Sequence, residues 1–140
     1  MKIWRIVLLP LLVLALTASM APAQAEVSLR KRVLVTLREQ GGFAGLNNRV
    51  IVYANGCVRL SRRTGPTVDK CLTDKEERTL RGHLKRLKLG RSETTPPGAD
   101  FIAYTLAYKG RRTTRYTLPS TWQPVVRQLE KALDKYWAPD

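Results

Sequence analysis

Residues 122–136 carry apolar side chains at helical spacing, and this stripe constrains the fold more than any other feature of the sequence. Such a helix has to bury one face against another layer. Ser120 and Gln123 have the spacing of a capping box, and Pro124 shifts the start by a residue or two without breaking the helix. The apolar stripe consists of Trp122, Val125, Val126, Leu129, Ala132, Leu133 and Tyr136.

A second amphipathic helix is predicted over residues 73–89. Thr73 and Glu76 have capping-box spacing at its start, and Gly90 suits a left-handed residue at its end. Its apolar stripe consists of Leu80, Leu84 and Leu87.

The remaining segments alternate apolar and polar residues with the period of strands. Asn55-Gly56 and Lys109-Gly110 mark two tight hairpin turns. The loops are expected at residues 62–72 and 91–99, and the strands at residues 32–40, 49–54, 58–60, 101–108 and 112–118. The sequence thus predicts an α+β fold of order βββαββα. It is an antiparallel sheet of about five strands with both helices packed on one face.

The first 25 residues have the pattern of an export signal. Lys2 and Arg5 precede an apolar run over residues 6–16, and Ala23-Gln24-Ala25 resembles a cleavage site. The alternative is a retained membrane anchor, which Pro10 and the short apolar run disfavour. We expect a secreted or periplasmic protein, a single domain over residues 26–140, and no stable membrane span once the signal is removed.

Export also bears on the cysteines and on the charge. Cys57 and Cys71 are the only pair available, and an oxidising compartment favours a disulfide between them over two buried thiols. The formal net charge of +14 attracts phosphate, anionic lipid or an acidic protein without choosing among them. Export argues against an intracellular nucleic acid as the partner.

The sequence offers little of what catalysis requires. His83 is its only histidine, so a nucleophile–base pair or a set of three metal ligands has few members to draw on. Glu76 and Glu77 are better explained as first-turn residues of a helix. We therefore predict a protein that is not an enzyme and that carries no cofactor and no metal.

A glycine-rich segment departs most from ordinary strand and turn patterns. Its backbone is free to adopt unusual angles and to approach another surface closely, while Phe43 either points outward or folds back into the core. No side chain of the segment is a zinc ligand. The segment comprises Gly41, Gly42, Phe43, Ala44, Gly45 and Leu46.

This segment and four others resemble the emfourin family, small proteinaceous inhibitors of thermolysin-like zinc metallopeptidases such as protealysin. The similar parts are a first strand running into residues 38–46, a strand pair, the helix start at residues 72–77, Pro97-Gly98-Ala99-Asp100-Phe101 before Tyr104, and the closing helix. The resemblance spans residues 33–136.

The resemblance implies a monomeric, non-enzymatic inhibitor that blocks the active-site cleft of a secreted thermolysin-like metallopeptidase with residues 41–46. Asp100 then either supports the neighbouring surface or caps a turn. Two other functions stay open on the sequence. One is an exported basic module that binds anionic envelope polymers, lipid or an acidic protein, and the other is an accessory protein of the envelope.

Overall fold

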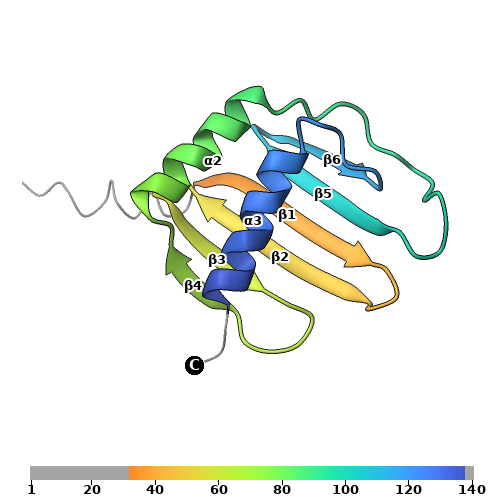
Figure 1. Cartoon of the computed structure of the whole chain (residues 1–140), viewed down its shortest axis with the longest axis horizontal. Helices are drawn as coiled ribbons and strands as arrows, with labels where there is room; N and C mark the ends of the chain where they lie inside the picture. The colour runs from red at the N-terminus through yellow and green to blue at the C-terminus, as the bar shows by residue number, and fades with distance from the viewer. Residues whose placement is uncertain (1–31, 138–140) are drawn as a thin grey trace, which may run out of the picture.

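The computed structural model describes residues 32–137, which form a six-stranded antiparallel sheet with two helices on one face (Figure 1). The spatial order of the strands is β4-β3-β2-β1-β5-β6. The helices are α2 (Asp74–Arg86) and α3 (Gln123–Tyr136). The strands are β1 (Val33–Gly41), β2 (Leu46–Tyr53), β3 (Cys57–Ser61), β4 (Val68–Cys71), β5 (Ile102–Tyr108) and β6 (Arg111–Arg115).

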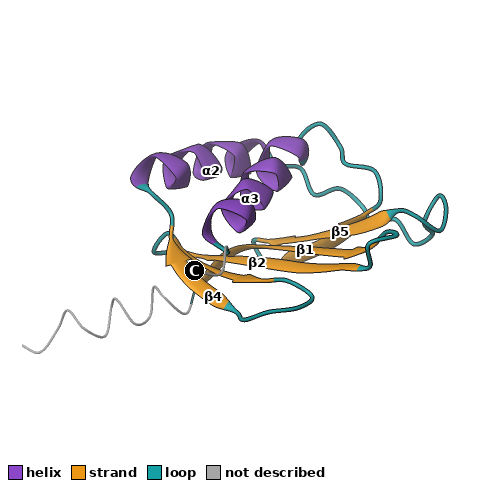
Figure 2. Cartoon of the chain, turned by 60° about the horizontal axis from the view of Figure 1, so that its bottom comes forward, coloured by secondary structure: helices purple, strands orange, loops and turns teal. Residues whose placement is uncertain are grey.

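This architecture confirms the predicted α+β fold with both helices on one face of the sheet. Figure 2 shows α2 and α3 together on one side and the opposite side of the sheet without a helix. The predicted signal peptide, residues 1–25, lies outside the described residues. Within residues 32–137, no helix is long and apolar enough to cross a membrane.

The sheet has six strands because the predicted loop at residues 62–72 contains β4. This strand is short and has a single large apolar residue, Val68, so the sequence shows no alternation there. It pairs with β3 so that Cys57 lies opposite Cys71, and the two cysteines form the predicted disulfide. Arg59 and Asp69, also directly opposite, form an ion pair with 2.9 Å between Nε and Oδ1.

The two predicted hairpins are present, but their turns differ. Lys109 and Gly110 both have positive φ angles, 50° and 75°, as a two-residue turn requires. The β2–β3 turn is instead a three-residue loop in which the Gly56 amide donates to the Tyr53 carbonyl at 3.0 Å. Only Gly56 has positive φ there, because Asn55 uses its side chain to accept from the Cys57 amide at 3.1 Å.

Helix α2 begins as predicted and ends early. The Thr73 hydroxyl accepts from the Glu76 amide, and the Glu76 carboxylate accepts from the Thr73 amide. The helix was expected to reach Leu89 and to stop at Gly90, but Leu87 is already extended. Ending there allows Leu89 to be buried in the core.

The predicted capping box of α3 is wrong. Trp122 occupies the N-cap position without a side-chain cap, and the Gln123 side chain donates from Nε2 to the Leu118 carbonyl instead. The indole of Trp122 is fully buried and donates from Nε1 to the Lys88 carbonyl at 3.0 Å. Burial of this large side chain, with its one polar atom satisfied, therefore sets the start of the helix.

Both predicted apolar stripes face the sheet. The stripe of α3 is buried, with Tyr136 packed at its edge, and Leu80 and Leu84 of α2 join it. From the strands, the core takes Val35, Leu37, Val50, Val52, Val58, Leu60 and Leu106.

The outer side of β6 is covered by the irregular segment that follows α2. The Glu93 amide donates to the Thr114 carbonyl at 2.8 Å, and the Thr114 amide donates to Ser92 Oγ at 3.1 Å. The Glu93 carboxylate accepts from the Tyr116 amide at 2.6 Å. The backbone of this edge strand is thus partly satisfied by a loop rather than by another strand.

Candidate functional site

The glycine-rich segment forms the loop between β1 and β2. Gly41, the last residue of β1, pairs with Leu46 on one side and with Ile102 on the other. The Gly45 amide donates to the Gly42 carbonyl at 3.0 Å and closes the turn. Phe43 at its tip is 92% exposed, so it points outward and does not fold back into the core.

Two glycines allow this loop to lie against the start of β5. Gly41 and Gly42 have φ angles of 99° and 71°, which side chains rarely adopt. A Cβ at Gly41 would lie 3.1 Å from the Phe101 carbonyl oxygen, and one at Gly42 would lie 3.3 Å from Ile102 Cγ1. The close approach that the sequence predicted is therefore made, in this chain, to a neighbouring segment of the same protein.

The structure brings Asp100 to this loop. A Cβ at Gly42 would lie 3.8 Å from the Asp100 carbonyl oxygen, and the Asp100 side chain is exposed. The seven residues predicted for a peptidase contact thus gather at one end of the sheet, although they come from two separate segments.

The sequence analysis did not include Phe101 among the contact residues. Its side chain is 43% exposed beside the loop, and Val33, the other exposed large apolar residue besides Phe43 in the described part, lies at the far end of β1. The sequence did contain a signal for Phe101, because an aromatic residue there follows a Pro- and Gly-rich stretch directly before a strand. Phe43 and Phe101 give this end of the molecule an apolar, projecting surface.

Just below the loop, β1 places a carboxylate inside the protein. Glu39 follows Val35 and Leu37 on the inward side of the strand and is only 3% exposed. Asn48 Nδ2 donates to Glu39 Oε2 at 2.9 Å, whereas Oε1 is buried without a hydrogen-bond partner among the described residues. The sequence carried this signal, since an inward strand position occupied by a charge is unusual.

Glu130 of α3 is the neighbour of this buried carboxylate. Burial raises the pKa of Glu130 to about 7, and the negative charges of Glu39 and Asp134 add to the rise. The positive charge of Arg127 acts in the opposite direction. The hydroxyl of a protonated Glu130 is a donor, which the carboxylate of Glu39 favours.

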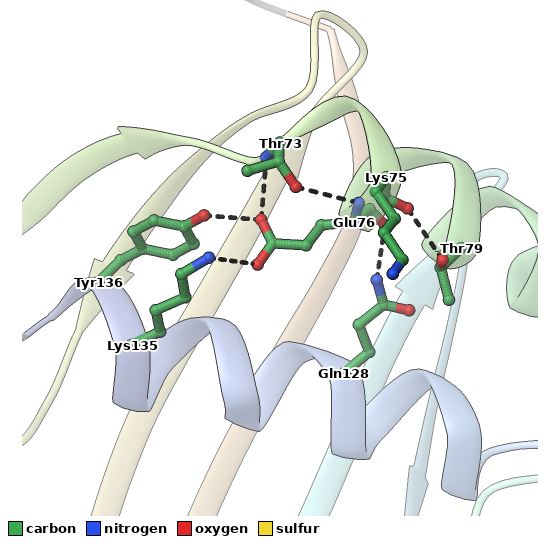
Figure 3. A network of polar contacts seen from close by, with 7 residues as sticks. All are labelled: Thr73, Lys75, Glu76, Thr79, Gln128, Lys135 and Tyr136. Carbon is green, nitrogen blue, oxygen red and sulfur yellow. Dashed lines mark hydrogen bonds and ion pairs between the residues drawn. The ribbon is translucent and has the colours of Figure 1, made fainter.

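A second carboxylate site joins the two helices (Figure 3). Glu76 of α2 accepts from the Tyr136 hydroxyl at 2.6 Å and from Lys135 Nζ at 2.8 Å, besides the Thr73 amide at 2.9 Å. Burial alone would raise the pKa of Glu76, but these hydrogen bonds outweigh it and lower the pKa to about 2. Capping by Glu76 was predicted from the sequence, whereas its attachment to α3 was not.

The side of the sheet without helices carries unpaired basic residues. Arg38 of β1 lies directly opposite Arg49 of β2, and both are exposed. Neither forms an ion pair with a described residue. Like charges at directly opposed strand positions destabilise a sheet, so this pair marks a place where an anion would be favourable.

Two hollows lie away from the glycine-rich loop. One, of about 630 Å³, is lined by Tyr53, Arg59, Lys70 and the disulfide, together with Val33 at the start of β1. The other, of about 360 Å³, runs between α2 and α3. Among residues 32–137, no group of three or more His, Cys, Asp or Glu side chains is placed to hold a metal ion.

Comparisons with protein-family models, with curated proteins and with solved structures found no match for this chain. Membership of the emfourin family therefore stays a prediction from the sequence resemblance.

Proposed function

We propose that this protein inhibits a thermolysin-like zinc metallopeptidase by inserting the β1–β2 loop into the active-site cleft. The observation that carries the proposal is the 92% exposure of Phe43 at the tip of a hydrogen-bonded turn. A large apolar side chain held in water has an unfavourable free energy, which burial in a partner removes. The resemblance to emfourins implies a thermolysin-like target, and the main specificity pocket of these enzymes accepts bulky apolar side chains.

The support behind the loop favours a blocking role. Strand β1 pairs along its length with β2 and β5, so the base of the loop is held from both sides. An inhibitor that is already in its bound conformation loses less conformational entropy on binding. Phe101 and Asp100 lie beside the loop and widen the surface that meets the walls of the cleft.

The loop blocks the enzyme without a side-chain ligand for its zinc ion. Residues 41–46 contain no His, Cys, Asp or Glu, so the blockage is steric or uses a backbone carbonyl. The inhibitor is then a wedge that leaves the metal of the peptidase in place.

Inhibition of a purified thermolysin-like peptidase, followed with a fluorogenic peptide, tests the proposal. Phe43→Ala is expected to weaken inhibition by about 1–3 kcal/mol, the range of an interface anchor. Val33→Ala is the matched control, because Val33 is also exposed and apolar but lies at the opposite end of β1. Equal inhibition by Phe43→Ala and the wild type, or no inhibition by the wild type at micromolar concentration, contradicts the proposal.

A charge at the tip provides a second test, and Ala44 is the position for it. Gly42 is unsuitable, because its φ of 71° and the contact with Ile102 would strain the fold of any variant. Ala44 is exposed, and its φ is not positive. Ala44→Glu is expected to abolish inhibition while the circular dichroism spectrum and the unfolding midpoint stay unchanged.

A second candidate function is binding to an anionic polymer or lipid surface through the sheet face without helices. The opposed Arg38 and Arg49 favour it. Arg38→Gln/Arg49→Gln is expected to abolish binding to anionic vesicles or polyphosphate at low salt, and wild-type binding is expected to vanish at raised salt. The variant should inhibit the peptidase as the wild type does, which separates the two functions.

A further inference from the structure

The groove between α2 and α3 has the size and the lining of a small-ligand site. Its volume of about 360 Å³ falls in the range of pockets that hold small molecules. Its apolar lining includes Leu72 before α2, Pro124 at the start of α3 and Ala132 two turns later. Neither function proposed above uses this groove.

Basic side chains line the groove from both helices. Lys75 and His83 come from one face of α2, two turns apart, and Arg127 and Lys131 come from successive turns of α3. None of the four forms an ion pair with a described residue.

Two carboxylates lie near these basic side chains, and neither neutralises their positive charge. Glu76 lines the groove, but Tyr136 and Lys135 hold its carboxylate. Glu130 and Arg127 attract each other through their charges but form no hydrogen bond or ion pair. Basic groups that face each other across a groove repel, and a bound anion turns this repulsion into attraction.

Gln128 lies in the wall of the groove and links the two helices. Its Nε2 donates to the Glu76 carbonyl at 2.6 Å, which fixes the amide between the helices, while its Oε1 is buried without a hydrogen-bond partner among residues 32–137. Figure 3 shows the Lys75 side chain pointing from α2 toward Gln128. The wall of the groove is therefore fixed at this position.

We propose that this groove binds a small phosphate ester. The phosphate, with up to two negative charges, matches several cations better than a single carboxylate does. It would lie among Lys75, Arg127 and Lys131. The carbon skeleton would contact the apolar lining of the groove.

Titration of the oxidised protein with glycerol 3-phosphate, followed by backbone amide chemical shifts, tests this site. Inorganic phosphate and glycerol are the comparison ligands, because each has only one of the two recognised parts, the phosphate and the carbon skeleton. We expect shifts concentrated in α2 and α3 and an affinity for the ester at least tenfold higher than for inorganic phosphate. Equal affinity for the two, or shifts spread over the sheet, overturns the proposal.

A pair of variants separates the groove from the general charge of the protein. Lys75→Gln/Lys131→Gln removes two groove cations and is expected to weaken binding of glycerol 3-phosphate at least tenfold. Lys85→Gln/Lys88→Gln removes the same charge from exposed positions outside the lining and is expected to leave affinity within twofold of wild type. An equal loss in both variants shows unspecific charge attraction and overturns the proposal. All four lysines are exposed, so both variants should keep the wild-type spectrum and unfolding midpoint.

Discussion

Two glutamate sites contact α3, and they have opposite electrostatics. Glu76 receives hydrogen bonds from an amide, a hydroxyl and an ammonium group, and its pKa falls to about 2 although burial opposes the change. Glu130 is half-buried next to the carboxylate of Glu39, and its pKa rises to about 7. The number of hydrogen-bond donors within reach, more than burial, decides whether the ionised form of such a side chain is favourable.

The two sites also lie in regions with different tasks. Glu76 ties the start of α2 to the last turn of α3, so its hydrogen bonds stabilise the packing of the two helices. Glu39 lies two residues before Gly41, so the unfavourable pair is directly beneath the loop proposed to bind a peptidase. The carboxylate with more hydrogen-bond donors therefore lies where the two helices pack together, and the one with fewer donors lies next to the candidate site.

Removal of the Glu76 side chain is expected to have the largest effect. Glu76→Ala eliminates the capping bond and the contacts to Tyr136 and Lys135, and should lower the free energy of unfolding at pH 7 by about 2–3 kcal/mol. Urea denaturation measures it. Asp74→Ala, an exposed carboxylate in the same first turn, is the control and should lose less than about 1 kcal/mol. Equal losses would mean that the helix dipole, not the network, accounts for the effect.

The same variant should change the acid limb of the stability curve. The folded-state pKa of Glu76 lies below its ordinary value of 4.5, so its stabilisation is complete above that pH and is lost as the pH falls toward 2. The wild type should therefore lose more stability than Glu76→Ala between pH 5 and pH 2. Parallel curves for the two proteins would contradict the assignment.

The Glu130 site should give a smaller effect of the opposite sign. The folded-state pKa of Glu130 is raised, so the stabilisation from its protonated form is fully present below pH 4.5. That stabilisation is lost as the pH rises through about 7. Glu130→Gln replaces the carboxyl group of Glu130 with an uncharged amide that is a donor for Glu39. At pH 8 this variant should be more stable than wild type by about 1–2 kcal/mol, a value reduced for the partial exposure of Glu130.

At pH 4.5 the gain from Glu130→Gln should disappear. Asp134→Asn is the control, because Asp134 is 75% exposed and pairs with Arg62 at the surface. A similar gain at pH 8 from Asp134→Asn would show that net charge, and not the buried pair, is responsible.

The Tyr136 hydroxyl should account for about 1 kcal/mol of the Glu76 site. Tyr136→Phe keeps the ring that packs on the core and removes only the donor. A double-mutant cycle with Glu76→Gln measures the coupling between the two side chains. A coupling energy near zero would assign the stabilisation to the cap alone.

The smallest effect is expected at Lys135. Its side chain is 54% exposed, so its ion pair with Glu76 is screened by water and salt. Lys135→Gln should lower the free energy of unfolding by no more than about 0.5 kcal/mol. A loss above 1 kcal/mol would show that the charge of Lys135, rather than the hydroxyl of Tyr136, dominates the site.

The two capping boxes show what local sequence determines. Thr73 with Glu76 and Ser120 with Gln123 have the same spacing, yet only the first forms. At the second, burial of Trp122 fixes where α3 begins, and that is a tertiary property. Gly90 fails as a helix end for a similar reason, because the burial of Leu89 favours an earlier stop.

The candidate site was predictable in composition but not in geometry. Glycines at residues 41–45 indicated an unusual loop, and the direction of Phe43 stayed open because no local pattern decides it. The approach of Asp100 and Phe101 depends on the pairing of β1 with β5 across some sixty residues of sequence. Glu130 and Glu39 likewise meet only after α3 packs on the sheet.

The edges of the sheet bear on how the protein behaves at high concentration. An open edge strand is a template to which a second chain adds, and this is a common route to aggregation. Residues 92–93 cover part of β6, while β4 is four residues long, has exposed Asp69 and Lys70, and is held to β3 by the disulfide. In a reducing environment β4 loses that covalent link, and when it detaches the longer and more apolar β3 becomes the edge. We therefore expect the disulfide to protect solubility as well as the folded state.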